Sequence, residues 1–287
     1  MRTPIASKTY YEESEQLLSK QINDLFVENP KGPGALPATR LDPDGEPVQG
    51  IIVPHAPYKF AGPCMSWAYK ALAENKQDSD LYIIVAQSPH GEGTSTETFV
   101  TPMGQIRPDQ DFIKALIDKG HMQVNEEAHA KEALIELQLP FLQFIRGIHK
   151  DQIKIVPLLV GSETSMNELS VDIKETLVDQ GKKATFIFIS NLTSYGRDFH
   201  YVPFTEHIPE NIAKVDKVFI DAIKAGEKSV FEETAKETTM YPSGYFALEL
   251  YFAFFNKPEI FLEQNYLSGD INDNYNNTVS YASFVIK

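Results

Sequence analysis

The chain has little cysteine, no long apolar run and no basic cluster. Cys64 is the single cysteine among 287 residues, which excludes an internal disulfide and a multi-cysteine metal cluster. No stretch approaches the roughly 18 consecutive apolar residues that cross a bilayer, and residues 1–8 lack the apolar core of a secretory signal. The formal net charge is −14, which argues against phosphate contacts with nucleic acid. These absences predict a cytoplasmic protein with neither a membrane nor a nucleic-acid partner.

The chain alternates between two kinds of segment. Continuous apolar runs are typical of strands buried on both faces of a parallel sheet, and they lie at 81–86, 153–160 and 185–189. Apolar residues at helical spacing predict helices at 9–27, 127–148, 164–180, 209–225 and 229–237. Two more strands are expected at 259–266 and 279–286. This alternation predicts an α/β layered sandwich, with helices packed on a mainly parallel central sheet.

Proline and glycine give three local predictions. Gly62-Pro63 is expected to form a turn that precedes a helix at 65–72. Pro140 is expected to bend the helix at 127–148, because proline removes a helical hydrogen bond. The Pro/Gly-rich segment 29–49 is expected to be a surface loop within one domain that spans residues 1–287, since the helix before it could hardly fold alone.

Two histidines each follow an apolar run. His55 comes directly after the run 51–53, and His90 follows the run 81–86. Loops at the carboxyl ends of strands converge on one crevice in α/β proteins, so both positions are suited to chemistry. A hydrogen-bonded structural histidine is an equally common role for such a residue. The two rings are the best-placed polar pair in the sequence.

Seven ordered segments resemble the Memo family, also known as the B protein of the AmmeMemoRadiSam system. They are VPHAPY at 53–58, IIVAQSPHG at 83–91, KEALIELQLPF at 131–141, VPLLVG at 156–161, ISNLTSY at 189–195, SGY at 243–245 and VSYA at 279–282. The resemblance implies a fold like that of class III extradiol dioxygenases. It also implies a pocket in which family members present His, His and Cys, a set proposed to bind iron or copper.

Most polar positions of that pocket differ from the family pattern. His55 matches it, and His90 matches the second of two adjacent family histidines. Five other positions have lost their ligand or proton-transfer group, namely Pro89, Ala133, Asn191, Ser194 and Ser243. Pro and Ala have no donor atom in the side chain, and neutral Asn and Ser are weak ligands for a transition metal. The substitutions therefore weaken the expectation of a metal site.

Two main hypotheses follow from these departures. The first is a homologue that has lost the metal site and acts as a non-catalytic or metal-independent binding or scaffold protein, with an unidentified small-molecule or protein partner. Its ligand pocket is expected to contain His55, His90, Asn191, Ser194, Ser243 and Tyr245. The second is a dioxygenase-like or redox enzyme that binds iron or copper through His55 and His90. Hydrolysis or group transfer by another set of residues is a third possibility.

The resemblance places His55 and His90 in one pocket.

Other polar groups are expected to have structural roles. Glu127, His129 and Glu132 are expected on a solvated acidic face, with a ligand cluster as the alternative. Cys64 is expected to be a small buried thiol. The G-x-S-x-G motif of many serine hydrolases is absent, which argues against a hydrolase triad of that type.

Overall fold

Four adjacent parallel strands form the middle of the sheet at the centre of the molecule. The computed structural model describes residues 1–38, 47–74 and 79–287. The parallel strands are β1 (Gly50–Val53), β2 (Leu81–Gln87), β6 (Lys154–Val160) and β7 (Ala184–Ile189). β5 (Gly104–Pro108) continues the parallel arrangement beside β6. In the described part of the chain the sheet has ten strands: eight follow the order β4-β5-β6-β2-β7-β1-β10-β8, while β3 pairs with β6 and β9 with β10. The expected α/β architecture with a mainly parallel central sheet is confirmed.

The remaining strands extend this core at its margins. They are β3 (Gly93–Thr94), β4 (Phe99–Thr101), β5 (Gly104–Pro108), β8 (Ser194–Gly196), β9 (Ile260–Leu267) and β10 (Asn277–Ile286). β10 runs antiparallel to β1, β8 and β9. The strands expected at 259–266 and 279–286 are therefore confirmed, and both lie beside the parallel core.

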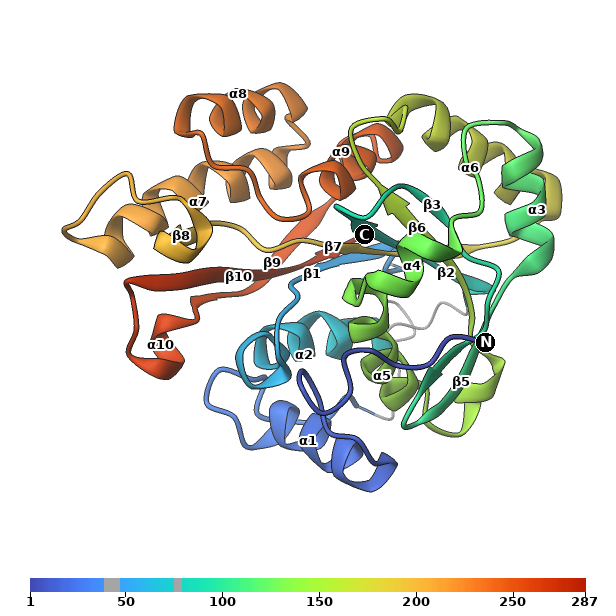
Figure 1. Cartoon of the computed structure of the whole chain (residues 1–287), viewed down its shortest axis with the longest axis horizontal. Coiled ribbons are helices and arrows are strands. Elements are labelled where there is room, and N and C mark those ends of the chain that lie inside the picture. The colour runs from blue at the N-terminus through green and yellow to red at the C-terminus, as the bar shows by residue number, and fades with distance from the viewer. Residues whose placement is uncertain (39–46, 75–78) are drawn as a thin grey trace.

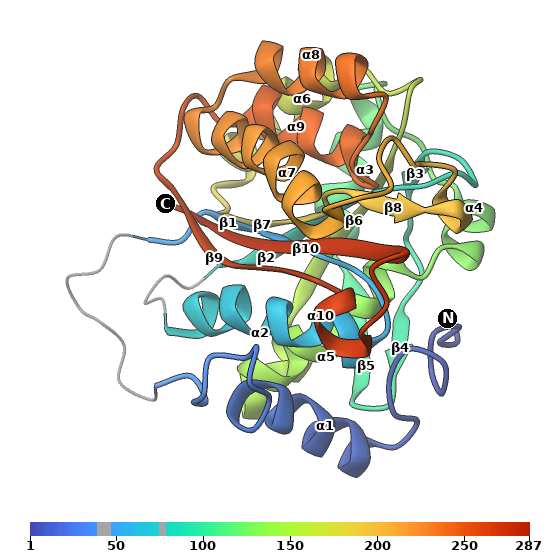
Figure 2. The ribbon, with the colours of Figure 1, turned by 90° about the vertical axis from the view of Figure 1, so that its left-hand side faces the viewer.

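Helices cover both faces of the sheet (Figures 1 and 2). One layer consists of α1 (Glu15–Val27), α2 (Tyr58–Glu74) and α5 (Leu134–Arg146). The other consists of α3 (Gln110–Asp118), α6 (Met166–Gln180), α7 (Ile208–Ala225), α8 (Lys228–Thr238) and α9 (Tyr245–Phe254). Shorter helices are α4 (Glu126–Lys131), α10 (Gly269–Asn272), η1 (Gly147–Gln152) and η2 (Arg197–Phe199).

Alternation along the strands separates two apolar cores. Ile51 and Val53 pack in the core beneath α1, α2 and α5, whereas Ile52 packs in the core on the opposite face. Successive side chains of a strand point to opposite faces of the sheet, so a continuous apolar run is needed to fill both layers. This explains why the runs at 81–86, 153–160 and 185–189 lack polar alternation.

The turn expected at Gly62-Pro63 is wrong, whereas the bend expected at Pro140 stays a prediction. Gly62 and Pro63 lie inside α2, and Pro140 lies inside α5. The helical segment expected at 127–148 breaks instead at Glu132, whose φ of −104° and ψ of 121° are extended. In α2 the Tyr266 hydroxyl donates to the Phe60 carbonyl (2.5 Å) and accepts from the Cys64 N–H (3.2 Å). A side chain from β9 thus satisfies backbone groups beside Pro63, which lets the helix continue.

The N-terminal segment, residues 1–14, packs against α5 and does not extend α1. The expected helix at 9–27 begins only at Glu15, after Ser14 caps it. The carboxylate of Glu136 accepts from the N–H groups of Ile5 (2.8 Å) and Ala6 (3.0 Å) and from the Tyr11 hydroxyl (2.5 Å). Glu136 is 1% exposed, so a buried carboxylate fixes a segment about 130 residues away in sequence.

Two further expectations concern the surface and the membrane. Residues 29–38 and 47–49 have no helix or strand, as expected for part of the loop predicted at 29–49, and its residues 39–46 lie outside the described ranges. Within the described ranges, no helix combines the length and apolar character needed to span a bilayer. The cytoplasmic location stays a prediction.

Candidate functional site

A cavity opens where the four parallel strands end. His55 follows β1, Gln87 closes β2, Gly161 follows β6 and Asn191 follows β7. The cavity has a volume of about 710 Å³. Its lining comes from these loops, from the break between α4 and α5 and from the start of α9. The lining residues are His55, Gln87, Ser88, Pro89, Gly91, Glu92, Glu132, Leu134, Gly161, Ser162, Glu163, Ser243 and Phe246. This is the edge of an open α/β sheet at which ligands bind.

Three of the expected site residues meet in one hydrogen-bonded group. Nε2 of His55 lies 2.8 Å from Oγ of Ser243, and the Asn191 N–H donates to the same Oγ at 3.0 Å. The Asn191 side chain accepts from the His55 N–H (2.9 Å) and donates to the His55 carbonyl (2.9 Å). Asn191 therefore fixes the histidine backbone while its own backbone fixes the serine.

Gly244 brings Ser243 against the end of β7. A Cβ at Gly244 would lie 2.0 Å from the Ile189 carbonyl oxygen and 2.7 Å from Cβ of Ser190. Its N–H donates to Ser190 Oγ at 3.2 Å. No residue with a side chain fits this close approach, so glycine is required here by space. The turn before α9 therefore places the Ser243 hydroxyl at the carboxyl end of the sheet.

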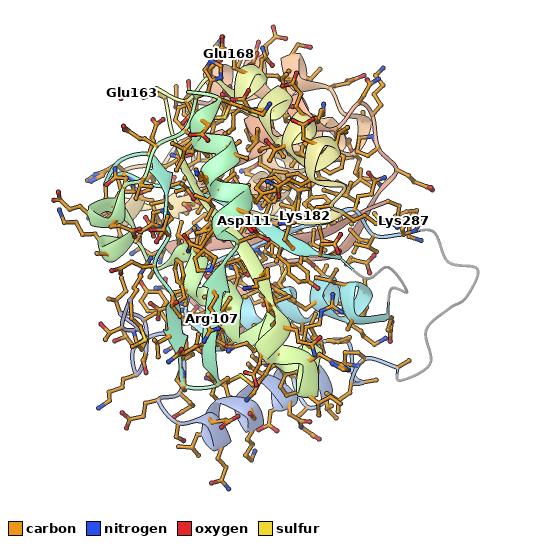
Figure 3. All side chains as sticks on the ribbon, turned by 90° about the vertical axis from the view of Figure 1, so that its right-hand side faces the viewer. Arg107, Asp111, Glu163, Glu168, Lys182 and Lys287 are labelled. Atoms are coloured by element: carbon orange, nitrogen blue, oxygen red, sulfur yellow. The ribbon has the colours of Figure 1, made fainter. Side chains whose placement is uncertain are left out.

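The cavity wall is acidic. Glu92, Glu132 and Glu163 line it, and no Lys or Arg occurs among its described lining residues. Glu92 Oε1 accepts from the Glu163 N–H at 2.8 Å. Figure 3 shows Glu163 and Glu168 near the same end of the molecule, with Lys182 and Lys287 lying away from them. The described lining thus has three carboxylates and no basic side chain, which disfavours an anionic ligand.

Burial keeps the His55 ring uncharged. His55 is half-buried as a residue, and desolvation by the surrounding protein lowers the pKa of its ring to about 4. Above that pH one ring nitrogen carries a hydrogen and the other is an acceptor. Ser243 Oγ already accepts from Asn191, so its own hydrogen is available for Nε2 of His55.

The other three expected site residues are not brought to this group. His90 is exposed and is absent from the lining of the cavity. Ser194 lies on β8, where it pairs with Val279. Tyr245 begins α9, and its ring stacks on Phe231 with centroids 5.3 Å apart. The structure thus does not bring the two histidines together, because the loop after β2 turns His90 outward.

The expected acidic face at Glu127, His129 and Glu132 is only partly correct. His129 is 0% exposed and Glu132 is 8% exposed, whereas the Glu127 side chain is 82% exposed and pairs with Lys131. Nε2 of His129 lies 3.1 Å from the Gly93 carbonyl. His129 lies on the buried side of α4 and Glu132 at the break after it, so only Glu127 is exposed as expected.

The donor set does not fit the iron or copper that the family resemblance implies. Nε2 of His55 is engaged with a neutral serine, and the Asn191 amide is used on the His55 backbone. Among the described residues no group of three or more His, Cys, Asp or Glu is arranged to hold a metal ion. The lone cysteine is buried in α2, and burial raises the pKa of the Cys64 thiol to about 12.

Several cavity residues were not expected from the sequence. Gln87, Glu92, Glu163 and Phe246 line the cavity, and Gln87 Oε1 accepts from the Phe246 N–H at 3.1 Å. The signal that could have found Gln87 and Glu163 is their position at, or just after, the end of a parallel strand. Phe246 has no such signal, because it lies in an aromatic helix that reads as core.

Acid is expected to destabilise the fold through two histidines. Desolvation lowers the pKa values of His55 and His129 to about 4, from 6.5. Their contribution to stability is complete above pH 6.5 and is lost as pH falls toward 4, because the unfolded chain then binds more protons. In urea titrations between pH 4 and 6.5, His55→Gln should reduce the slope of unfolding free energy against pH by up to about 1.4 kcal/mol per unit.

The control is His200→Gln, since His200 is exposed. Its slope should equal that of the unmodified protein. An unchanged slope in His55→Gln would contradict the desolvation argument.

Comparisons with known proteins identify the family of the chain. A family model described as Memo-like protein matches residues 2–285. A MEMO1 family protein of Methanopyrus kandleri is 28% identical over 298 residues, covering 100% of this chain and 99% of the relative. Another, of Methanococcoides burtonii, is 30% identical and covers 78% of this chain and 75% of the relative.

One solved structure supports the fold alone. An uncharacterized protein of Escherichia coli K12 aligns with a TM-score of 0.55 and 10% sequence identity, covering 84% of this chain and 100% of that chain. The family match extends over nearly every described element, from the N-terminal segment to β10. This match includes the loops that carry His55, Asn191 and Ser243. Because the family model covers almost the whole chain, the chain belongs to the Memo-like protein family.

Proposed function

We propose that the protein is a metal-independent member of its family that binds a small organic molecule in the cavity at the carboxyl ends of β1, β2, β6 and β7. The observation that supports this most directly is the 2.8 Å contact between Nε2 of His55 and Ser243 Oγ. A ring nitrogen held by a hydroxyl, with neutral Asn191 beside it, offers a weak site for a transition ion, since thiolate and carboxylate charge is missing there.

The chemistry of the wall favours a neutral or positively charged ligand. Three carboxylates line the cavity beside Phe246, and none of the described lining residues is basic. An organic ammonium group is attracted both by carboxylates and by an aromatic face. A carboxylate or phosphate ligand would be repelled by the same carboxylates.

Metal analysis and a matched ligand series test the proposal. Protein purified without chelator or affinity tag is expected to contain far less than one equivalent of iron or copper. Inductively coupled plasma mass spectrometry measures this content. Saturation-transfer NMR should then detect binding of 2-phenylethylamine and 2-phenylethanol but not of 3-phenylpropionate, three compounds of similar shape and different charge. Glu163→Gln should weaken the amine signal and leave the alcohol signal unchanged.

The opposite results would refute the proposal. Near-stoichiometric iron or copper that is lost in His55→Ala would support the dioxygenase-like or redox alternative. Preferential binding of 3-phenylpropionate would refute the assignment of the ligand charge.

A further inference from the structure

We infer that Ser243 is a nucleophile and His55 its general base, so that the cavity can accept an acyl group from a small ester. The inference rests on the proposed metal-independent cavity and adds a reaction to it. A hydroxyl becomes nucleophilic when a neighbouring base lies within hydrogen-bonding distance to take its proton, and this requires about 2.6–3.2 Å. Oγ of Ser243 and Nε2 of His55 are 2.8 Å apart, and both residues line the cavity.

Asn191 acts as a positioning residue for this pair. Its side chain bonds both the N–H and the carbonyl of His55, each at 2.9 Å. Its own N–H donates to Ser243 Oγ at 3.0 Å. That bond occupies one lone pair of the hydroxyl oxygen, and in the His55 tautomer with an unprotonated Nε2 the hydroxyl hydrogen is donated to that nitrogen. One residue therefore fixes both partners relative to the end of β7.

The Ser243 backbone is held as firmly as its side chain. The next residue, Gly244, donates its N–H to Ser190 Oγ at 3.2 Å and packs directly against the Ile189 carbonyl. The Tyr245 N–H donates to the Pro242 carbonyl at 2.9 Å. A nucleophile on such a restrained turn loses little freedom when it meets a bound substrate, which favours reaction.

Gln87 supplies a donor for the negative charge that would develop on the carbonyl oxygen. Its Oε1 accepts from the Phe246 N–H at 3.1 Å, which orients the amide. Within the described part of the chain its Nε2 has no hydrogen-bond acceptor, and the residue lines the same cavity. A preorganised donor of this kind stabilises the oxyanion of a tetrahedral intermediate.

The step balances with an ester and water alone. Ser243 Oγ attacks the carbonyl carbon, and its proton passes to Nε2 of His55. The bond from the carbonyl carbon to the alcohol oxygen breaks, and that oxygen takes the proton from His55. This leaves an ester on Ser243 and a free alcohol. Water then attacks the acyl carbon with His55 again as base, and a carboxylic acid and the serine hydroxyl are released.

The surroundings of His55 define the substrate class. No carboxylate among the described residues is hydrogen-bonded to its ring, so the dyad lacks the third group that orients and stabilises an imidazolium in a triad. Desolvation, which lowers the pKa of His55 to about 4, also makes the ring a weak base, so we expect reaction with activated esters and not with amides. The acidic wall further selects acyl groups that are neutral or positively charged.

An active-site probe of serine nucleophiles tests the inference. A fluorophosphonate is attacked by the serine oxygen, the P–F bond breaks, fluoride leaves and the hydroxyl proton is lost through His55. Intact-mass spectrometry should show one label on the full chain, and peptide mapping should place it on Ser243. Ser243→Ala and His55→Gln should lose the label, and hydrolysis of p-nitrophenyl acetate should fall by about 100-fold or more in each.

Matched variants show whether a loss of labelling or of ester hydrolysis results from unfolding. Ser194→Ala makes the same change outside the cavity, on β8, and should be labelled like the unmodified protein. Ser243→Cys should react with iodoacetamide, whereas the unmodified protein should not, since its lone thiol at Cys64 is buried. Circular dichroism of each variant should match that of the unmodified protein.

The results separate this inference from the proposed function. A label that persists in Ser243→Ala, or a folded Ser243→Cys that does not react, overturns the inference. Metal-free protein that remains unlabelled overturns the inference alone. Near-stoichiometric metal bound at His55 overturns the proposed function as well.

Discussion

Replacement of Glu136 by alanine is expected to lower the free energy of unfolding by about 3–5 kcal/mol. The buried carboxylate accepts from the N–H groups of Ile5 and Ala6 and from the Tyr11 hydroxyl. Its removal leaves three donors without this acceptor beneath the N-terminal segment, and hydrogen bonds to a charged group are among the stronger ones in proteins. Urea denaturation followed by far-ultraviolet circular dichroism measures the change.

A second glutamate provides the matched control. Glu127→Ala removes an exposed carboxylate whose partner is Lys131, and exposed ion pairs contribute little. Its denaturation curve should overlay that of the unmodified protein. If Glu136→Ala behaved in the same way, the N-terminal segment would not depend on this carboxylate.

Substitution of Gly244 by alanine is expected to break the contact between Ser243 and His55 and to cost about 1–3 kcal/mol of stability. The new methyl group would lie 2.0 Å from the Ile189 carbonyl oxygen, and that backbone cannot move without disturbing β7. The turn before α9 must therefore shift outward and take Ser243 with it. Nitrogen-15 NMR of the His55 ring, which reports its hydrogen bonds, should change on substitution.

Gly181→Ala controls for the glycine-to-alanine change itself. Gly181 ends α6 with a φ of +60° and has open space around its Cα, so alanine there is expected to cost about 1 kcal/mol from backbone strain alone. The His55 ring signals should stay unchanged in that variant. Unchanged signals in Gly244→Ala would contradict the steric argument.

The central strands could be predicted from the sequence because the pattern that identifies them, a continuous apolar run, is local. A run such as 81–86 has to be apolar throughout to fill both cores, which makes a strand buried on both faces easy to identify. The turn expected at Gly62-Pro63 was wrong because the cost of a proline inside a helix depends on distant partners. The Tyr266 hydroxyl bonds Phe60 and Cys64 from a strand about 200 residues away. Sequence patterns around Pro63 contain no trace of that contact.

The site could be predicted only in part. His55, Asn191 and Ser243 were expected in one pocket, and the structure joins them by hydrogen bonds. His90 was expected beside them on the family pattern, yet the loop after β2 leaves it exposed. Loop conformation has no periodic signature, so the direction of a side chain on such a loop cannot be read from residue type.

The pairing of β1 has a consequence for how the chain refolds. Gly50 is paired with Phe186 on one side and with Ile286 on the other, so both neighbours of this strand lie far along the polypeptide. Closing such long loops slows folding, and until both have closed β1 offers two open edges to other molecules. Recovery from denaturant should therefore favour dilute protein, because intermolecular association competes with the last docking step.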